Sequence, residues 1–220
     1  MPGNIRPIAP VRIDPNRPDP ALIQHAAQTI QSGGVIIFPT SGLYGLGADA
    51  TNRDAVHRIF QIKRRVTKKP ILVLIQNADQ LDRWVTTLPE MARNLIDRHW
   101  PGGITLIFKA RQHLPTNLTA GTEKIGIRVP AHPVARALVE SVDFPVTATS
   151  ANIADDPGCA AINDLPPSLI EDVDLILDAG TLSGGKGSTV VDVTAESLKI
   201  LRSGTVPTEQ IFSIKKPPFH

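Results

Sequence analysis

The chain has one cysteine, few aromatic residues and no long apolar run, and each shortage excludes a class of protein. Cys159 has no partner for an internal disulfide, which is typical of a reducing compartment. No stretch approaches the roughly 20 consecutive apolar residues that span a bilayer. The N-terminus also lacks the apolar segment of a secretory signal. We therefore expect a cytoplasmic protein that does not associate with membranes.

Charge and histidine usage argue against two further classes, proteins with a strong overall attraction for nucleic acid and proteins that hold a metal ion. The net charge is only +2 over 220 residues, so the whole molecule has little attraction for nucleic acid. The six histidines have no metal-ligand spacing, and no His-Glu-x-x-His motif occurs. We therefore predict no metal held by the protein itself. A Mg²⁺ ion carried by a nucleotide is compatible with the sequence, because such an ion needs few protein ligands.

Length and pattern favour one α/β domain. A chain of 220 residues can bury the core of a single large domain. Strand and helix patterns alternate over residues 19–212 without a linker, repeat or low-complexity segment, which predicts a mixed sheet with flanking helices. Residues 1–18 are rich in proline and should form an extended arm or edge segment. Residues 213–220 form a basic tail.

Hydrophobic periodicity and capping residues set the expected elements. Asp19–Pro20 predicts the start of a helix that ends at Gly33, and the pattern over residues 51–54 predicts the start of a second helix. Further helices are expected over 78–85, 89–99 and 133–141, and near 207–212. Strands are expected over 35–38, 71–75, 104–109, 125–129, 146–149, 173–178, 188–193 and 198–201. Loops are expected over 111–123 and 180–187.

Residues 33–70 contain the strongest local signal. A buried strand leads into a loop with Gly42, Gly45 and Gly47, where exposed backbone N–H groups could meet an anion. An amphipathic helix follows, and five of the seven residues over 63–69 are basic. Together these features predict a pocket for a phosphorylated ligand. Taken separately, each also fits an ordinary turn or a solvated helix end.

Two nearby motif matches do not carry a function. Gly180, Gly185 and Lys186 nearly spell a P-loop, but no Ser or Thr follows the lysine and a strand is expected over 188–193 instead of a helix. Ser183 and Lys186 also match the Ser-x-x-Lys of β-lactamase-like enzymes, whose Lys-Thr-Gly motif is missing. We interpret both matches as chance.

Four polar residues at strand ends have two readings each. Arg128 lies in an apolar strand, either as a solvent-facing side chain or as a clamp for a carboxylate or phosphate. Ser150 and Asn152 follow a strand end, either as turn formers or as lining of a ligand crevice. Arg202 follows a short strand and has the same ambiguity.

Seven segments in order resemble the YrdC family, the threonylcarbamoyl-AMP synthases of tRNA modification. The resemblance covers roughly residues 20–211, and the ordered set is far more specific than any one member. The segments are FPTSGLYGLGADA at 38–50, the pair Lys63-x-Arg65, WPGGITLIF at 100–108, IGIRVPAHPVARAL at 125–138, ATSAN at 148–152, GSTVVDV at 187–193 and ILRSG at 200–204.

The resemblance implies a fold and a reaction. The expected fold is a single α/β YrdC-like domain, with a twisted mixed sheet and flanking helices around a large positively charged cavity. The implied enzyme is a nucleotidyltransferase that condenses L-threonine, bicarbonate and ATP, with Mg²⁺ carried by ATP, into threonylcarbamoyl-AMP and pyrophosphate. A threonylcarbamoyltransferase complex would then modify tRNA.

The resemblance also implies roles for individual residues. Lys63 and Arg65 would hold the triphosphate and stabilise charge as pyrophosphate leaves. The full set for ATP would be Lys63, Arg65, Lys69, Ser150, Asn152 and Arg202. The set for threonine would be Thr40, Tyr44, Arg128 and Ser188, with Arg128 on the carboxylate. No metal ligand is implied.

Four positions depart from the family's common pattern. Ser41–Gly42 stand where Asp or Glu and then Thr are usual, Leu74 where many members have histidine, and Lys69 where many have asparagine. The position of ILRSG near the end of the sequence predicts the short form of the family, without a further domain. One alternative is a YciO-like paralogue that binds RNA or a nucleotide without making the adenylate. A second is a non-catalytic protein that binds RNA through the basic cavity, although exposed aromatic residues for base stacking are few.

Overall fold

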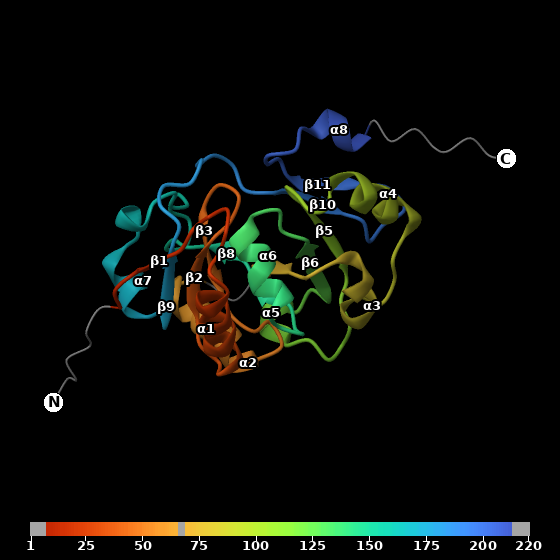
Figure 1. Cartoon of the computed structure of the whole chain (residues 1–220). Coiled ribbons are helices and arrows are strands. Elements are labelled where there is room, and N and C mark those ends of the chain that lie inside the picture. Colours follow the sequence, from red (N-terminus) through yellow and green to blue (C-terminus); the bar gives the residue numbers. More distant parts are fainter. Residues whose placement is uncertain (1–7, 66–68, 213–220) are drawn as a thin grey trace.

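The computed structural model describes residues 8–65 and 69–212, and the strands in this part of the chain form two mixed sheets (Figure 1). In spatial order, the five-stranded sheet contains β1 (Val11–Arg12), β9 (Leu175–Asp178), β2 (Ile36–Pro39), β3 (Tyr44–Gly47) and β8 (Thr149–Ser150). The six-stranded sheet contains β11 (Lys199–Arg202), β10 (Thr189–Asp192), β5 (Ile104–Lys109), β6 (Lys124–Arg128), β4 (Val73–Leu74) and β7 (Val146–Thr147). Each sheet combines parallel and antiparallel pairs.

The predicted α/β class is confirmed, but the prediction of one sheet is wrong for the described residues, which form two. The expected strand over 146–149 is in fact β7 and β8, which pair with β4 and β3 in different sheets. Between them, the Ala148 N–H donates to the carbonyl of Leu72 at 2.9 Å. The chain therefore changes its pairing partner within five residues, which the alternation of side chains along a strand cannot signal.

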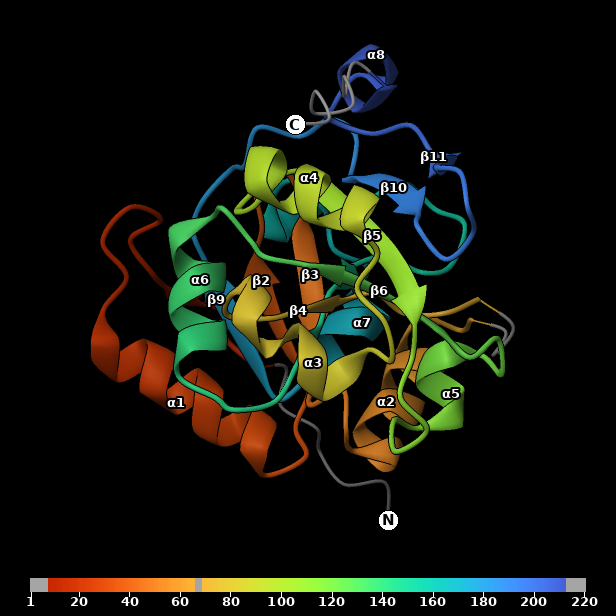
Figure 2. The same ribbon diagram turned by 90° about the vertical axis from the view of Figure 1, so that its right-hand side faces the viewer.

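Helices flank both sheets (Figure 2). They are α1 (Pro20–Gln31), α2 (Arg53–Ile62), η1 (Ala78–Gln80) leading into α3 (Leu81–Trp84), α4 (Glu90–His99), α5 (Thr116–Thr119), α6 (Pro133–Glu140), η2 (Ile162–Asp164), α7 (Pro167–Glu171) and α8 (Thr208–Phe212). None of the helices described here is long and apolar enough to cross a membrane.

The capping residues that predicted the first two long helices are confirmed. The Asp19 carboxylate accepts a hydrogen bond from the Ala21 N–H at 2.8 Å, and Pro20 occupies the first helical position. The Asn52 side chain accepts hydrogen bonds from the first turn of α2. By contrast, α5 lies inside a segment expected to be a loop, and α7 was not predicted. These helices span four and five residues, too short to show a helical period.

The glycine-rich stretch after β2 is a hairpin, not the open loop that the sequence predicts. Residues 44–47 form β3, which pairs with β2 on one side and β8 on the other. A Cβ atom on Gly47 would lie 2.8 Å from the ring of Phe38, so the glycine leaves room for that buried side chain. The prediction of an anion-binding loop is therefore wrong at residues 44–47, where backbone groups pair within the sheet.

Small residues let α1 and α6 pack closely against the five-stranded sheet. Ala26 and Ala27 of α1 and Ala135 of α6 are fully buried in a cluster with Ile36 and Leu177 of the sheet. Figures 1 and 2 show these two helices side by side. At the edge of the same sheet, β1 pairs in parallel with β9, so the described part of the N-terminal arm extends the sheet.

Candidate functional site

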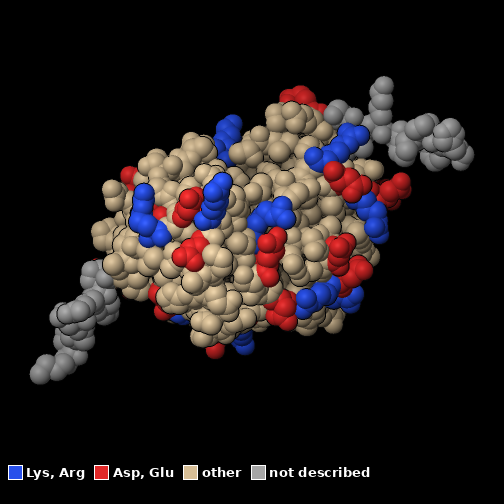
Figure 3. Space-filling model, in the orientation of Figure 1, with Lys and Arg blue, Asp and Glu red and all other residues tan. Residues whose placement is uncertain are grey.

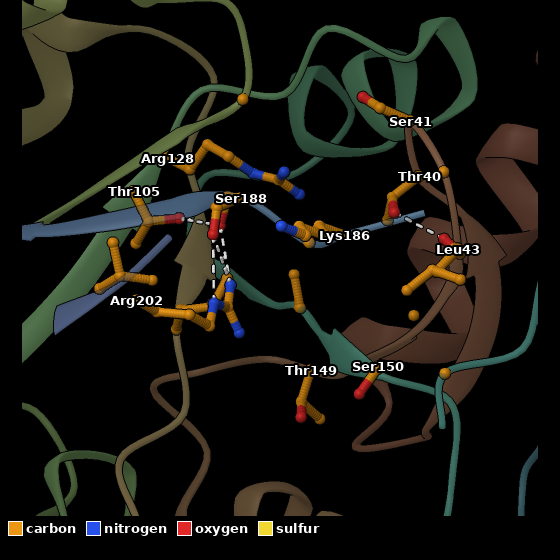
Figure 4. A pocket seen from close by; sticks show the side chains of 18 of the residues that line it. Thr40, Ser41, Leu43, Thr105, Arg128, Thr149, Ser150, Lys186, Ser188 and Arg202 are labelled. Atoms are coloured by element: carbon orange, nitrogen blue, oxygen red, sulfur yellow. Dashed lines mark hydrogen bonds between the residues drawn. The ribbon is translucent and has the colours of Figure 1, made fainter. Parts of the chain in front are cut away.

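A cavity of about 490 Å³ opens between the two sheets (Figure 4). One wall comes from the six-stranded sheet and carries Thr105, Arg128, Ser188 and Arg202. The opposite wall comes from residues 40–45 and from β8. The sheet change at residues 146–150 therefore brings segments far apart in sequence to one chamber.

The charged side chains that line this cavity are all cationic. They are Arg65, Arg128, Lys186 and Arg202, and no Asp or Glu occurs among the lining residues that the structure describes. On the outer face seen in Figure 3, by contrast, acidic and basic side chains are interspersed. Cations without carboxylate partners in a chamber of this size suit a small ligand with several negative charges.

Arg128 is the buried cation of the chamber. It ends β6, its side chain enters the cavity, and the residue is only 8% exposed. Its Nε atom has no hydrogen-bond partner, and its guanidinium forms no ion pair with the described residues. Burial, followed by the nearby charge of Arg202, lowers the pKa of Arg128 to about 10, so the group stays charged at neutral pH. This resolves the ambiguity left by the sequence: Arg128 does not face solvent.

Ser188 lies between two polar partners. Its hydroxyl is 2.7 Å from the hydroxyl of Thr105 and accepts a hydrogen bond from Arg202 at 3.2 Å. The Arg202 guanidinium also donates to the Ser188 carbonyl, at 2.8 and 3.2 Å. The sequence assigned Ser188 to threonine and Arg202 to the nucleotide, whereas in the structure they contact each other.

A turn at the end of α2 separates the predicted catalytic pair. Arg64 adopts the left-handed conformation, with φ of 49°. Its N–H donates to Gln61 and the next N–H, of Arg65, donates to the carbonyl of Phe60, both at 2.9 Å. This is the Schellman pattern of a helix end. Lys63 precedes the turn, donates the last helical hydrogen bond to Ile59 and lies on the buried face of α2. The turn then directs Arg65 to the cavity wall.

Lys63 is buried behind the cavity wall. Its ammonium donates to the Ser150 carbonyl at 2.5 Å and to the Asn152 carbonyl and side-chain oxygen at 2.8 and 2.9 Å. The residue is 2% exposed and is not among those that line the chamber. Burial, followed by the charge of Arg65, lowers the pKa of Lys63 to about 7.

Asn152 is the centre of the same turn. Its side-chain oxygen also accepts from the Ser150 hydroxyl at 2.5 Å, and its amide nitrogen donates to Ile153 and Asp156 at 2.9 and 2.5 Å. Asn152 is 5% exposed and lies behind the lining, whereas Ser150 forms part of it. The structure thus assembles Lys63, Ser150 and Asn152, with Ser150 at the surface of the chamber.

The predicted basic cluster does not form one group. Arg65 lines the cavity and donates to the Thr149 hydroxyl at 3.3 Å and the Pro70 carbonyl at 3.1 Å. Lys69 lies outside the lining and pairs with Asp155 at 2.8 Å on the exposed surface. Lys68 lies outside the described residues. The run over 63–69 therefore supplies one cavity cation among the residues described, and the role of Lys69 in ATP binding stays a prediction.

Thr40 and Tyr44 both line the chamber, with their hydroxyls already bonded. The Thr40 hydroxyl donates to the Leu43 carbonyl at 2.6 Å. The Tyr44 hydroxyl donates to the Gly180 carbonyl at 2.7 Å and accepts from the Ala179 N–H at 3.0 Å. Burial raises the pKa of Tyr44 to about 12. Both residues shape the wall, and Tyr44 also holds the segment that follows β9.

Gly42 lies in the turn between β2 and β3 and joins this turn to residues 183–187, which belong to the connection between β9 and β10. Its carbonyl accepts a hydrogen bond from the Gly184 N–H at 2.9 Å, and the Ser41 carbonyl accepts one from the Ser183 hydroxyl at 3.1 Å. A Cβ atom on Gly42 would lie only 2.4 Å from the Gly184 carbonyl oxygen. The departure at position 42 therefore allows the two loops to approach closely.

Thr105, Thr149 and Lys186 are among the polar lining residues that the sequence did not assign to the site. Thr105 and Thr149 lie within strand patterns, where nothing local distinguishes a cavity-facing hydroxyl. Lys186 was considered only as part of two rejected motif matches, the P-loop and the Ser-x-x-Lys motif. The glycines around it were the available signal, because a glycine-rich connection permits close approach of backbone to another segment or to a ligand.

Comparison with known proteins gives a consistent result. The family model Sua5/YciO/YrdC, described as telomere recombination, matches residues 28–204. A threonylcarbamoyl-AMP synthase from Pyrococcus abyssi is 35% identical over 189 residues, which are 86% of this chain and 56% of that protein. This chain thus spans little more than half the length of that relative.

Two solved structures share the fold. P. abyssi Sua5 complexed with L-threonine has a TM-score of 0.86 at 32% identity, over 94% of this chain and 61% of that chain. E. coli YciO has a TM-score of 0.84 at 29% identity, over 93% of this chain and 98% of that chain. The resemblance found in the seven sequence segments is confirmed, and the chain belongs to the Sua5/YciO/YrdC family.

Proposed function

We propose that this chain is a threonylcarbamoyl-AMP synthase, which condenses L-threonine, bicarbonate and ATP and releases pyrophosphate. The names of its relatives support this reading. The observation that carries it is Arg128, a buried guanidinium without a partner that faces a chamber lined by cations. A carboxylate matches the planar fork of such a group.

The proposed division of work follows from what each residue already contacts. Arg128 would bind the amino-acid carboxylate because its donors are uncommitted. Arg65 and Ser150 would face the phosphates from the opposite wall, and Arg202 with Ser188 would contact the nucleotide near the first site. Lys63 would reach a phosphate only by exchanging one of its three present hydrogen bonds.

The chemistry requires positioning more than a nucleophilic side chain. The threonine amine attacks the carbon of carbon dioxide formed from bicarbonate, a nitrogen–carbon bond forms, and the amine loses a proton. A carbamate oxygen then attacks the α-phosphorus, and the bond to the β-phosphate oxygen breaks to release pyrophosphate. No enzyme-bound covalent intermediate is involved, so fixed cations around the reacting groups would supply much of the rate.

Mg²⁺ would enter with ATP. No group of His, Cys, Asp or Glu suited to a metal occurs among the described residues, and the lining residues include no carboxylate. The phosphates themselves and water would therefore supply most of its ligands. The product would pass to a threonylcarbamoyltransferase complex that modifies tRNA.

A second candidate is a YciO-like protein that binds a nucleotide or RNA without forming the adenylate. Its support is the structural match to E. coli YciO, whose TM-score of 0.84 is close to that of the P. abyssi protein. Both candidates use the same cavity, so fold alone does not separate them.

Pyrophosphate release separates the two. The purified protein is assayed with ATP, Mg²⁺ and bicarbonate, with and without L-threonine. A synthase releases pyrophosphate only when threonine and bicarbonate are both present. The Lys63→Ala variant should release none under the same conditions. Binding of ATP or RNA without such release would reject the synthase in favour of the second candidate. RNA binding would also weaken steeply with salt, whereas threonine-dependent turnover would not follow that slope.

A further inference from the structure

Lys186 is a cation that neither the predicted site nor the proposed division of work includes. It lies in the glycine-rich connection between β9 and β10, and its side chain lines the cavity. In Figure 4 it occupies the space between Arg128 and Arg202 on one side and Thr40 and Ser41 on the other. It forms no ion pair or hydrogen bond with the part of the chain that the structure describes.

The backbone on both sides of Lys186 is fixed. Gly184 donates to Gly42, as described above, and the Gly187 carbonyl accepts a hydrogen bond from the Thr205 N–H at 3.0 Å. Gly184 and Gly185 have φ of 70° and 90°, a conformation that glycine adopts without strain. The loop thus holds the Lys186 backbone at the cavity while the ammonium stays free to move.

Lys186 and Arg128 suit different anions. Arg128 is rigid, 8% exposed and planar, which fits one carboxylate. Lys186 is exposed, flexible and carries a compact charge, which can follow a phosphate chain as its charge shifts during a reaction. Since the lining offers no acidic partner, the ammonium has only a ligand to neutralise it inside the cavity.

We propose that Lys186 is a binding residue for the polyphosphate of the nucleotide, acting from the loop that joins β9 and β10. This proposal rests on the proposed function, because it takes ATP as the ligand. It assigns phosphate contacts to two segments of the lining, with Arg65 beside β8 and Lys186 in the glycine-rich loop.

Calorimetric titration tests the assignment without turnover. ATP with Mg²⁺, AMP and L-threonine are titrated separately into the wild type, Lys186→Gln and Lys186→Arg, with Lys199→Gln as the matched control. Lys199 is an exposed lysine on β11 that does not line the cavity. We expect Lys186→Gln to weaken ATP binding about five- to twenty-fold, AMP binding less, and threonine binding by less than about two-fold. Lys186→Arg should recover most of the ATP affinity.

The outcomes separate the two proposals. If the wild type and Lys186→Gln bind ATP equally well, Lys186 has no phosphate contact and only this inference fails. If Lys186→Gln weakens threonine more than ATP, the residue serves the carboxylate and the inference is also overturned. If the wild type binds no ATP, the proposed function and the inference fail together. The thermal midpoint of Lys186→Gln should equal that of the wild type, since no described contact is lost.

Discussion

Lys63 and Arg128 are two buried cations at opposite walls of the chamber, and their surroundings differ completely. Lys63 has three oxygen acceptors for its three ammonium hydrogens. Arg128 has an unpartnered Nε and no ion pair among the described residues. Burial is similar, at 2% and 8% exposure, so it is not what separates them.

The difference indicates that Lys63 has a structural role and that Arg128 is available to bind a ligand. A buried charge with all its hydrogen bonds made stabilises the turn that it fills, whereas a buried charge without partners costs stability. Such a cost is common where a site is prepared for a substrate. Removing each charge should therefore have opposite effects on stability, and four predictions follow from this contrast and from the turn between Lys63 and Arg65.

The largest effect is expected for Arg128→Met. Without the guanidinium, the dissociation constant for L-threonine should rise about 100-fold, because hydrogen bonds between charged groups are lost. The free energy of unfolding should rise by about 1–2 kcal/mol, since an unpaired buried charge is replaced by an apolar side chain. Calorimetric titration and urea unfolding measure the two changes.

Arg136→Met is the matched control for Arg128→Met. Arg136 lies on the surface of α6 and pairs with Glu140 one turn later, so its loss should leave threonine binding unchanged and alter stability by less than about 0.5 kcal/mol. If Arg128→Met weakened ATP and threonine binding equally, the separation of carboxylate and phosphate sites would be wrong.

Lys63→Met should instead destabilise the protein. The Ser150 and Asn152 carbonyls would lose their donor, and we expect the free energy of unfolding to fall by about 1–3 kcal/mol. Threonine-dependent pyrophosphate release should fall as well, because Lys63 supports Ser150, which lies at the surface of the chamber. Lys109→Met, at an exposed lysine that ends β5, is the control and should match the wild type. A Lys63→Met protein as stable as the wild type would show that the three bonds contribute nothing.

Local sequence signals predicted the helices and the polar ends of strands. Caps at Asp19 and Asn52 fixed the starts of α1 and α2, and the apolar runs located β5 and β6. The change of sheet at Ala148 was not predictable, because it depends on partners about 75 and 100 residues away that no local pattern specifies. For the same reason one sheet was predicted where two form.

The sequence predicted several of the residues that form the site, but it did not predict how they are arranged or which of them are buried. Arg128, Ser150 and Arg202 line the cavity. Their positions at strand ends had left two readings open, and the family resemblance had implied a role in the site. The burial of Lys63 was not foreseen, because a basic run at a helix end is usually solvated, whereas Lys63 lies one turn after Ile59 on the buried face of α2. Lys186 was missed because the glycines around it were tested only against a phosphate-binding motif.

Proton binding by Lys63 gives the next prediction. The pKa of Lys63 is about 7 in the folded protein, against 10.5 as its ordinary value. Between these values the unfolded chain binds more protons, so stability should rise with pH. Relative to Lys63→Met, the wild type should gain about 2 kcal/mol in free energy of unfolding from pH 7 to pH 9.

The neighbours of Lys63 do not reverse this sign. Arg65 stays charged throughout the range, and burial raises the pKa of the Cys159 thiol above its ordinary value of 9.0. Urea unfolding of both proteins at each pH measures the difference, so that titrations common to the two proteins cancel. A difference that falls with pH would mean that the three oxygens stabilise the ammonium more than burial destabilises it.

The smallest effect is expected for Arg64→Gly. Arg64 has φ of 49° at the position after the helix end where glycine is preferred, and its exposed side chain makes no hydrogen bond or ion pair with the described residues. Glycine removes the strain of a left-handed residue but adds freedom to the unfolded chain, so the free energy of unfolding should rise by only about 0.5–1 kcal/mol. Arg53→Gly, at the first position of α2, makes the same chemical change without left-handed strain and should not stabilise. If Arg64→Gly lowered stability as Arg53→Gly does, the turn that separates Lys63 from Arg65 would not be the left-handed one described here.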